Sequence, residues 1–172
     1  MIELRVLASK DAAEFQRLRL EGLRESPTAF SSSYEDERES DLARVAERIA
    51  SDSRRALFGA FDGDELVGLA GFHRETGRKL EHKAFIWGMY VTPRCRRRGI
   101  GRQLIERVLS HAAEQTGLRR INLGVNAANA AAIGLYEAVG FKAYGVEYAF
   151  LVVDQIEQDE IHMTYVIANE RS

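Results

Sequence analysis

The segment Arg94-Cys95-Arg96-Arg97-Arg98-Gly99-Ile100-Gly101-Arg102 decides the fold of this chain. It lies between a predicted strand over residues 85–91 and a helix that begins near Ile100, whose apolar residues recur at helical spacing. The first turn of a helix leaves backbone N–H groups unpaired, and the helix dipole adds positive potential there. The two glycines let an anion approach the backbone closely, and the arginines add charge-assisted hydrogen bonds. The segment therefore predicts a cradle for a phosphate or a diphosphate.

Several kinds of anion site could use such a segment. A Walker loop requires Gly-x-x-x-x-Gly-Lys-Ser/Thr, which this sequence lacks. A dinucleotide fingerprint requires a third glycine three residues after Gly101, where Leu104 stands. The third candidate is coenzyme A, whose diphosphate needs the same cradle. The alternatives are an arginine run that only faces solvent, or one that contacts RNA or DNA, although a net charge of -2 argues against a general nucleic-acid binder.

The composition is that of one globular domain over residues 1–172. Lys and Arg number 24 against 26 Asp and Glu, and 45% of the residues are hydrophobic. A chain of this length can bury a core that needs no disulfide or metal. The single cysteine, Cys95, cannot form an internal disulfide, which favours a reducing compartment. Because neither a signal peptide nor an apolar run of membrane-spanning length is present, we expect a cytoplasmic protein that does not contact a membrane.

Hydrophobic periodicity predicts a mixed α/β architecture. The expected strands cover residues 2–6, 56–61, 66–73, 85–91, 121–125, 141–146 and 161–167, and the expected helices cover 9–25, a segment starting near 40, 100–113 and 129–139. This order, β-α-α-β-β-β-α-β-α-β-β, predicts an α/β sandwich with a partly antiparallel sheet. Residues 28–34 are expected to form a loop, and residues 148–153 stay ambiguous. Gly88 indicates either a bulge or a close backbone approach within its strand.

Two blocks of the sequence resemble the GNAT superfamily of N-acetyltransferases. The first, Arg96-Arg97-Arg98-Gly99-Ile100-Gly101, matches the family's Gln/Arg-x-x-Gly-x-Gly/Ala motif. The second, Asn129-Ala130-Ala131-Ala132-Ile133-Gly134-Leu135-Tyr136-Glu137-Ala138-Val139-Gly140-Phe141, looks like its Asn-x-x-Ala-x-x-Leu-Tyr-x-x-x-Gly-Phe block. The blocks stand in the family's order with a strand between them. The resemblance implies a GNAT-like α/β fold, with a mixed, mostly antiparallel central sheet and helices on both faces. It also implies an acyltransferase that moves an acetyl group from acetyl-CoA to a primary amine by direct attack in a ternary complex.

The resemblance also implies which residues bind the coenzyme. It places the backbone of Met89, Tyr90 and Val91 along the pantetheine arm. It maps the cradle for the diphosphate onto Arg96, Arg97, Arg98, Gly99, Ile100, Gly101 and Arg102. Asn129 would bind the pantetheine or lie near the diphosphate, and it could equally cap the helix that follows. No metal is expected.

The resemblance assigns the chemistry to Tyr136. Acetyl transfer must expel a thiolate, and a phenol beside the sulfur can protonate that leaving group. The alternative for Tyr136 is a core aromatic residue. The general base stays open: some family members carry a glutamate on the strand before the cradle, but residues 85–89 contain no carboxylate. His73, His162 and Glu147 are the remaining options.

The acceptor site is expected between the segment that follows the first helix and the late strands. By resemblance, residues 27–34 and 144–150 cover the acceptor, and Phe30, Trp87 and Tyr148 could line its pocket. The acceptor is a small-molecule amine or a peptide amine, and the sequence does not separate the two. The alternative function is a noncatalytic acyl-CoA-binding or sensing module on the same fold. We expect no nucleic acid as a partner and allow for a homodimer.

Overall fold

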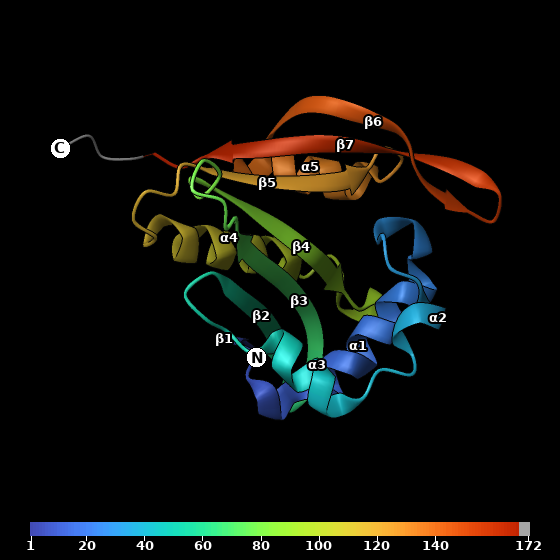
Figure 1. Cartoon of the computed structure of the whole chain (residues 1–172). Coiled ribbons are helices and arrows are strands. Elements are labelled where there is room, and N and C mark those ends of the chain that lie inside the picture. Colours follow the sequence, from blue (N-terminus) through green and yellow to red (C-terminus); the bar gives the residue numbers. More distant parts are fainter. Residues whose placement is uncertain (169–172) are drawn as a thin grey trace.

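Figure 1 shows the computed structural model of the chain, which describes residues 1–168. Within these residues, seven strands form one sheet in the order β1-β2-β3-β4-β5-β7-β6. The strands are β1 (Ile2–Val6), β2 (Arg55–Asp62), β3 (Glu65–Arg74), β4 (Lys83–Val91), β5 (Arg120–Asn126), β6 (Lys142–Val153) and β7 (Ile156–Val166). Only β4 and β5 are parallel; the other neighbouring strands of the described chain are antiparallel, as predicted.

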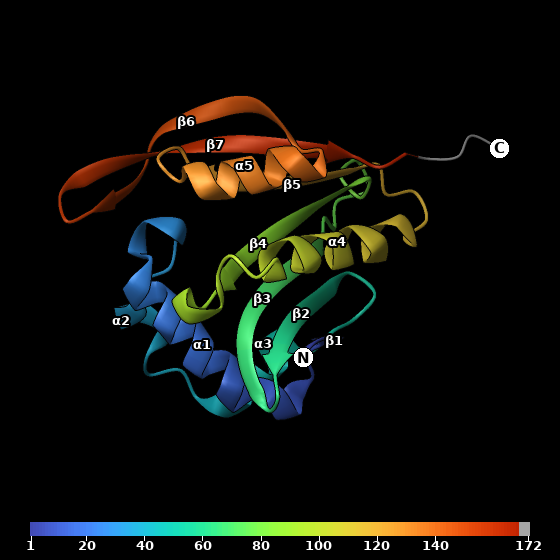
Figure 2. The same cartoon turned by 180° about the vertical axis from the view of Figure 1, so that it is seen from behind.

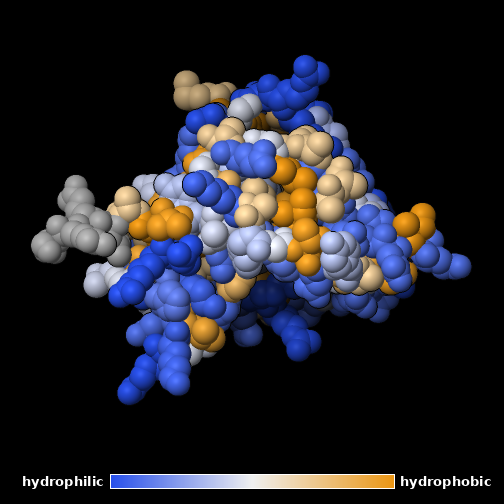
Figure 3. Space-filling view, turned by 90° about the horizontal axis from the view of Figure 1, so that it is seen from above, coloured by the Kyte–Doolittle hydropathy of each residue, from blue (hydrophilic) through white to orange (hydrophobic). Residues whose placement is uncertain are grey.

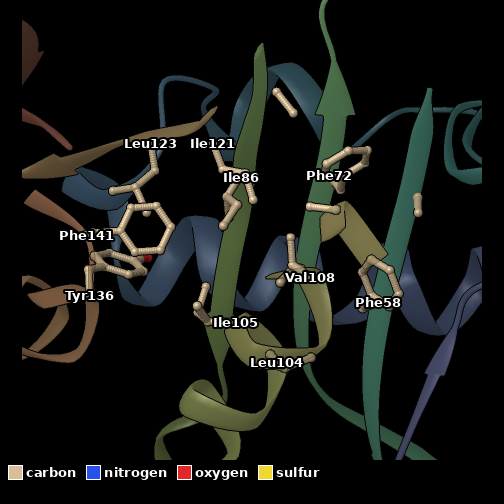
Figure 4. Packing of buried hydrophobic residues seen from close by; sticks show 14 of the residues in the cluster. Phe58, Phe72, Ile86, Leu104, Ile105, Val108, Ile121, Leu123, Tyr136 and Phe141 are labelled. Atoms are coloured by element: carbon tan, nitrogen blue, oxygen red, sulfur yellow. The ribbon is translucent and has the colours of Figure 1, made fainter. Parts of the chain in front are cut away.

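Helices cover both faces of the sheet. On one face lie α1 (Ala12–Glu25), α2 (Tyr34–Glu37) and α3 (Leu42–Ile49), and on the other lie α4 (Ile100–Ala113) and α5 (Ala130–Val139), which Figure 2 shows from behind. Each face has its own buried apolar cluster. The cluster under α4 and α5 includes Phe58, Phe72, Ile86, Leu104 and Val108 (Figure 4). The cluster under α1 and α3 includes Phe15, Leu18, Val45, Leu57 and Leu69.

The segment around the first helix differs from the prediction. A 3-10 turn precedes α1 because the carboxylate of Asp11 accepts the backbone N–H of Ala8 at 2.8 Å and bonds to Arg5. The expected loop over residues 28–34 contains part of a second 3-10 turn, Pro27–Ala29, and the first residue of α2. The first turn depends on a side-chain hydrogen bond and the second on the bond from the Ala29 N–H to the Ser26 carbonyl at 3.0 Å, and hydrophobic periodicity detects neither.

The last two strands are longer than predicted and form one hairpin. The ambiguous residues 148–153 belong to β6. Asp154 and Gln155 connect the strands with φ angles of +50° and +65°, as a tight two-residue hairpin turn requires. Ala149 has a φ of +51° and lies where the pairing with β7 is interrupted, which makes a bulge in β6. The turn contains no glycine, so the usual residue signal for such a turn is missing.

Apolar side chains are exposed on this hairpin. Figure 3 views the molecule from the side where β6 and β7 lie, and apolar side chains gather in the middle of that face. The exposed apolar residues of the two strands are Tyr144, Val146, Tyr148, Val152, Ile156 and Val166. The homodimer stays a prediction. No helix in the described part of the chain is long and apolar enough to cross a membrane.

β4 and β5 pair at one end only. Residues 83–85 pair with residues 120–122, and beyond them the two strands diverge. Gly88 has a φ of +64° and lies at an irregularity in the pairing of β4 with β3, which confirms the predicted bulge. A bulge bends its strand and increases the local twist. The divergence leaves the facing edges of β4 and β5 without a neighbouring strand, and this is where the candidate site lies.

Candidate active site

A cleft of about 550 Å³ opens where β4 and β5 diverge. Its walls come from β4, the loop before α4, β5 and α5, together with Ser26 and Ala29 after α1. This volume falls within the roughly 300–1,000 Å³ of small-molecule and cofactor sites. Most of the residues predicted from the sequence line it: Trp87, Met89, Tyr90, Val91, Arg96, Arg97, Gly99, Ile100, Gly101, Arg102, Asn129 and Tyr136.

The loop before α4 presents a row of free backbone donors to this cleft. Among the described residues, no backbone carbonyl accepts the N–H groups of residues 97–102, and the first helical bond runs from the Gln103 N–H to the Gly99 carbonyl at 3.1 Å. Arg97 and Gly99 have φ angles of +62° and +77°. Alternation of right- and left-handed residues forms a concave nest of N–H groups that binds anions. The loop therefore fits the diphosphate of a coenzyme.

Three arginines of the loop differ in their surroundings. Arg97 lines the cleft and forms no ion pair within residues 1–168. Arg96 lies 2.6 Å from the Glu25 carboxylate, and its Nε donates to the Val91 carbonyl at 2.9 Å, so it fastens the loop to the end of α1. Arg102 bonds at 2.7 Å to a glutamate one turn further along α4. Arg97 is thus the loop arginine that remains available to a ligand.

Arg98 does not line the cleft, although it was predicted to bind the coenzyme. Its Nη1 lies 3.2 Å from Asp62 Oδ2 and 3.6 Å from the Sγ of the buried Cys95. The loop turns between Arg97 and Gly99, and this turn directs the Arg98 side chain toward the end of β2.

Tyr136 faces the cleft from α5. Its side chain is 5% exposed and packs edge-on against Phe141, with ring centroids 5.8 Å apart (Figure 4). Burial raises the pKa of the Tyr136 phenol, so the hydroxyl keeps its proton at neutral pH. Within the described chain the hydroxyl makes no hydrogen bond. It can therefore donate to a ligand in the cleft. The ring of Tyr136 belongs to the buried apolar cluster, so the alternative prediction of a core aromatic residue holds for the ring.

Two asparagines shape the same wall. Asn129 caps α5, because its Oδ1 accepts the Ala132 N–H at 3.1 Å, and it lines the cleft as well. Asn126 donates through Nδ2 to the Thr28 carbonyl at 3.3 Å, which holds the segment after α1 against β5. Both roles expected for Asn129 are thus sterically compatible, since capping uses only the oxygen of its amide.

The three residues predicted for the acceptor pocket lie apart. Trp87 lines the cleft, and its indole covers Gly71, where a Cβ would lie 2.2 Å from the ring. Phe30 is 9% exposed and packs in the core beside Tyr90, with ring centroids 6.3 Å apart, so it is not part of the cleft. Tyr148 is 78% exposed because it lies in the β6 bulge, and it does not line the cleft either.

A cluster of titratable side chains lies beside the cleft on β6 and β7. Glu160 Oε1 is 3.7 Å from His162 Nδ1, and His162 Nε2 is 3.3 Å from Glu147 Oε2. The carboxylate of Glu160 covers Gly124, a residue of the cleft wall. Burial raises the pKa of the Glu160 carboxyl; the positive charge of His162 opposes this rise and the negative charge of Glu147 adds to it.

Sequence reasoning named His162 and Glu147 but missed Glu160. The one signal for Glu160 was Gly124, a glycine inside a predicted strand, where a large side chain of a neighbouring strand can approach the backbone. His73, the third option for the base, lines a separate hollow with Arg48 and Ile49 and does not reach the cleft. Within residues 1–168, no three His, Cys, Asp or Glu side chains are grouped so that they could hold a metal ion.

Comparison with known proteins identifies the class of this fold and cleft. A sequence model described as "Acetyltransferase (GNAT) family" matches residues 20–141. The chain belongs to the GNAT family of acetyltransferases. This membership confirms the resemblance found in the two sequence blocks and agrees with acetyl-CoA as the co-substrate of the class.

Two relatives show how far the sequence likeness extends. A mycothiol acetyltransferase from Gordonia bronchialis is 36% identical over 110 residues, which are 62% of this chain and 35% of the relative. A ribosomal protein bS18-alanine N-acetyltransferase from Salmonella typhimurium is 35% identical over 86 residues, which are 50% of this chain and 57% of the relative. The chain thus spans about a third and just over half of the length of these two curated relatives.

Solved structures share the whole fold. A GNAT-family acetyltransferase from Streptococcus pneumoniae superposes with a TM-score of 0.89 at 22% identity, over 98% of this chain and 100% of that one. A putative acetyltransferase from Salmonella typhimurium, solved with its cofactor acetyl-CoA, has a TM-score of 0.85 at 17% identity, over 100% of this chain and 97% of that one. These likenesses confirm the predicted fold.

Proposed function

We propose that the protein transfers an acetyl group from acetyl-CoA to a primary amine by direct attack in a ternary complex. One observation carries this proposal: the free N–H groups of residues 97 and 99–102 and the unpartnered hydroxyl of Tyr136 line one cleft. The first feature suits the diphosphate of the coenzyme, and the second suits the sulfur that leaves. The unpaired edges of β4 and β5 suit the amide-bearing arm between them, since such an arm can bond to a strand edge.

The proposed role of Tyr136 follows from its protonation state. When the amine nitrogen bonds to the carbonyl carbon, the carbon–sulfur bond breaks and its electron pair stays on the sulfur. A phenol whose pKa is raised by burial is protonated at neutral pH, so it has a proton to share with the negative charge that develops on the sulfur. Tyr136 would therefore donate its proton to the departing sulfur. Met89, Tyr90 and Val91 are proposed to hold the arm of the coenzyme, and Arg97, Gly99 and Gly101 its diphosphate.

A panel of amines tests whether the protein transfers the acetyl group and which kind of amine accepts it. One relative is named for mycothiol and another for an alanine of a ribosomal protein, so the panel contains small amines and peptides that begin with alanine. Release of free thiol from acetyl-CoA, together with the mass of the acetylated product, measures turnover. We expect thiol release that requires both the protein and an amine. Binding of acetyl-CoA without turnover on any amine would contradict the proposal and would favour a noncatalytic acyl-CoA-binding module.

A further inference from the structure

We infer that Glu160 is the general base of this reaction and takes the proton of the acceptor amine on the side of β5 opposite Tyr136. The inference rests on the proposed function, because a base is needed only if an amine attacks the thioester. Primary amines are mostly protonated at neutral pH, so a side chain or a bound water must accept a proton. The strand before the cradle offers no carboxylate for this task.

The two faces of β5 separate Tyr136 from Glu160. Leu123 and Val125 are buried in the same apolar cluster as Tyr136, under α4 and α5. Because side chains alternate along a strand, Gly124 faces the opposite side. There the Glu160 carboxylate fills the space of the missing side chain, since a Cβ on Gly124 would lie 2.0 Å from Glu160 Oε1. Gly124 and Tyr136 both line the cleft, so the Glu160 carboxylate lies behind Gly124 on one face of β5 while Tyr136 lies on the other.

The surroundings of Glu160 suit a base. Its side chain is 17% exposed, and within the described chain no Lys or Arg pairs with it. The groups that face it are His162 on its own strand and Glu147 on β6, while β5 contributes Gly124 and Asn126, which do not titrate. Burial and the negative charge of Glu147 raise the pKa of Glu160 above the ordinary glutamate value, while His162 opposes this rise. The raised pKa brings the basicity of Glu160 closer to that of a general base at neutral pH.

A polar strip leads from Glu160 toward solvent. His162 lies between Glu160 and Glu147, and Glu147 is 54% exposed. Asn122 and Thr164, which pair on the same face, each carry a buried oxygen with no hydrogen-bond partner within residues 1–168. Such oxygens bond to ordered water when there is room for it. A proton taken by Glu160 would leave through His162 to Glu147.

The proton balance closes over these groups. The Glu160 carboxylate takes one proton from the ammonium form of the acceptor, which frees the lone pair of the nitrogen for attack. As the nitrogen bonds to the carbonyl carbon, it gives a second proton to water. The carbon–sulfur bond breaks, and the sulfur receives the proton of Tyr136. Glu160 releases its proton through His162, and the Tyr136 phenolate takes one from water. The enzyme is restored, and no oxidant, reductant or metal is required.

The test replaces the carboxylate without changing its shape. Glu160→Gln should lower kcat by about 10²–10⁴ at neutral pH, with partial recovery at alkaline pH, where the free amine is more abundant. Because burial disfavours the ionised form, the variant should melt no lower than the parent, and its affinity for acetyl-CoA should not change. Glu157→Gln, an exposed position on the same strand, is the matched control and should behave as the parent does.

A second variant moves the carboxylate to the neighbouring strand. In Gly124→Glu/Glu160→Gly, the new carboxylate on β5 occupies the space that the Glu160 side chain fills in the parent. Turnover of this variant should therefore exceed that of Glu160→Gln. A parent that acetylates amines while Glu160→Gln does so equally fast, with the same pH profile, would overturn the assignment of the base alone. A parent that acetylates no amine would overturn the proposed function and the base together.

Discussion

Gly124 of β5 leaves open the space that the carboxylate of Glu160 fills from β7. The same relationship holds between Gly71 of β3 and Trp87 of β4, where a Cβ would lie 2.2 Å from the indole. In both pairs a glycine on one strand allows a large side chain of the neighbouring strand to lie flat across it. In both pairs at least one member lines the cleft, so these contacts shape the candidate site.

The two glycines should respond differently to alanine. Gly124→Ala meets the end of a flexible glutamate side chain, which can swing away, so we expect near-parental stability but reduced turnover. Gly71→Ala meets a rigid indole ring and should destabilise the protein by about 1–3 kcal/mol, as overpacking does. Chemical denaturation and a turnover assay on both variants measure these effects. Equal loss of stability in both would show that Glu160 is held as firmly as Trp87.

The cradle is tested through Arg97. Arg97→Ala should weaken coenzyme A binding by about 1.5–3 kcal/mol, the range for a hydrogen bond to a charged group. Affinity for a pantetheine that lacks the diphosphate should change little. Arg98→Ala is the matched control, because that side chain turns to Asp62 and should affect neither ligand. Calorimetric titration of each variant with both ligands gives the comparison. Equal weakening by the two substitutions would mean that diffuse positive charge, and not the placement of Arg97, binds the coenzyme.

A substitution at Tyr136 tests whether its hydroxyl protonates the leaving sulfur. Tyr136→Phe removes the hydroxyl and keeps the ring that packs against Phe141. If the hydroxyl protonates the departing sulfur, kcat should fall by about 10²–10⁴ while the affinity for acetyl-CoA stays near that of the parent. Single-turnover kinetics would separate this loss from a slower release of product. A variant with parental kcat would reduce Tyr136 to a packing residue.

The stability of the helical face is tested at Glu37. This carboxylate is 7% exposed and bonds to Arg19 at 2.8 Å and to Arg48 at 3.2 Å. Burial opposes its ionisation, but the hydrogen bonds and charges of the two arginines outweigh burial and hold its pKa below the ordinary value. Glu37→Gln should therefore lower the free energy of unfolding at neutral pH by about 3–5 kcal/mol, because Arg19 remains buried without its counter-charge.

The pH dependence of this loss has a definite sign. A carboxyl with a lowered pKa in the folded state stabilises the fold above its unfolded pKa, and this stabilisation disappears as the pH falls through the folded pKa. The difference between parent and Glu37→Gln should thus be largest near neutral pH and shrink below the ordinary glutamate value of 4.5. Glu39→Gln, at an exposed position, is the control and should change stability by less than about 0.5 kcal/mol. If the difference in unfolding free energy between the parent and Glu37→Gln stays constant at acidic pH, Glu37 stabilises the fold through its shape alone.

The sequence by itself determined the family, the cradle and the position of Tyr136. The loop before α4 and the block from Asn129 to Phe141 are continuous in the chain, and each brings its own glycines, helix start and side chains. Sites built from one continuous segment can be predicted from the sequence, because the unpaired N–H groups at the start of a helix follow from the backbone alone. The same is true of the bulge at Gly88, whose glycine allows the positive φ found there.

Only the tertiary structure decided which side chains face the cleft. Arg98 pairs with Asp62, and Phe30 packs in the core. Tyr148 points to solvent because it lies in a bulge of β6 that contains no glycine and was therefore not predicted. Glu160 reaches Gly124 because β7 pairs with β5 in a single register, and a shift of one residue would direct its side chain to the other face of the sheet. Strand register depends on contacts between residues that are distant in the chain, so local sequence cannot specify it.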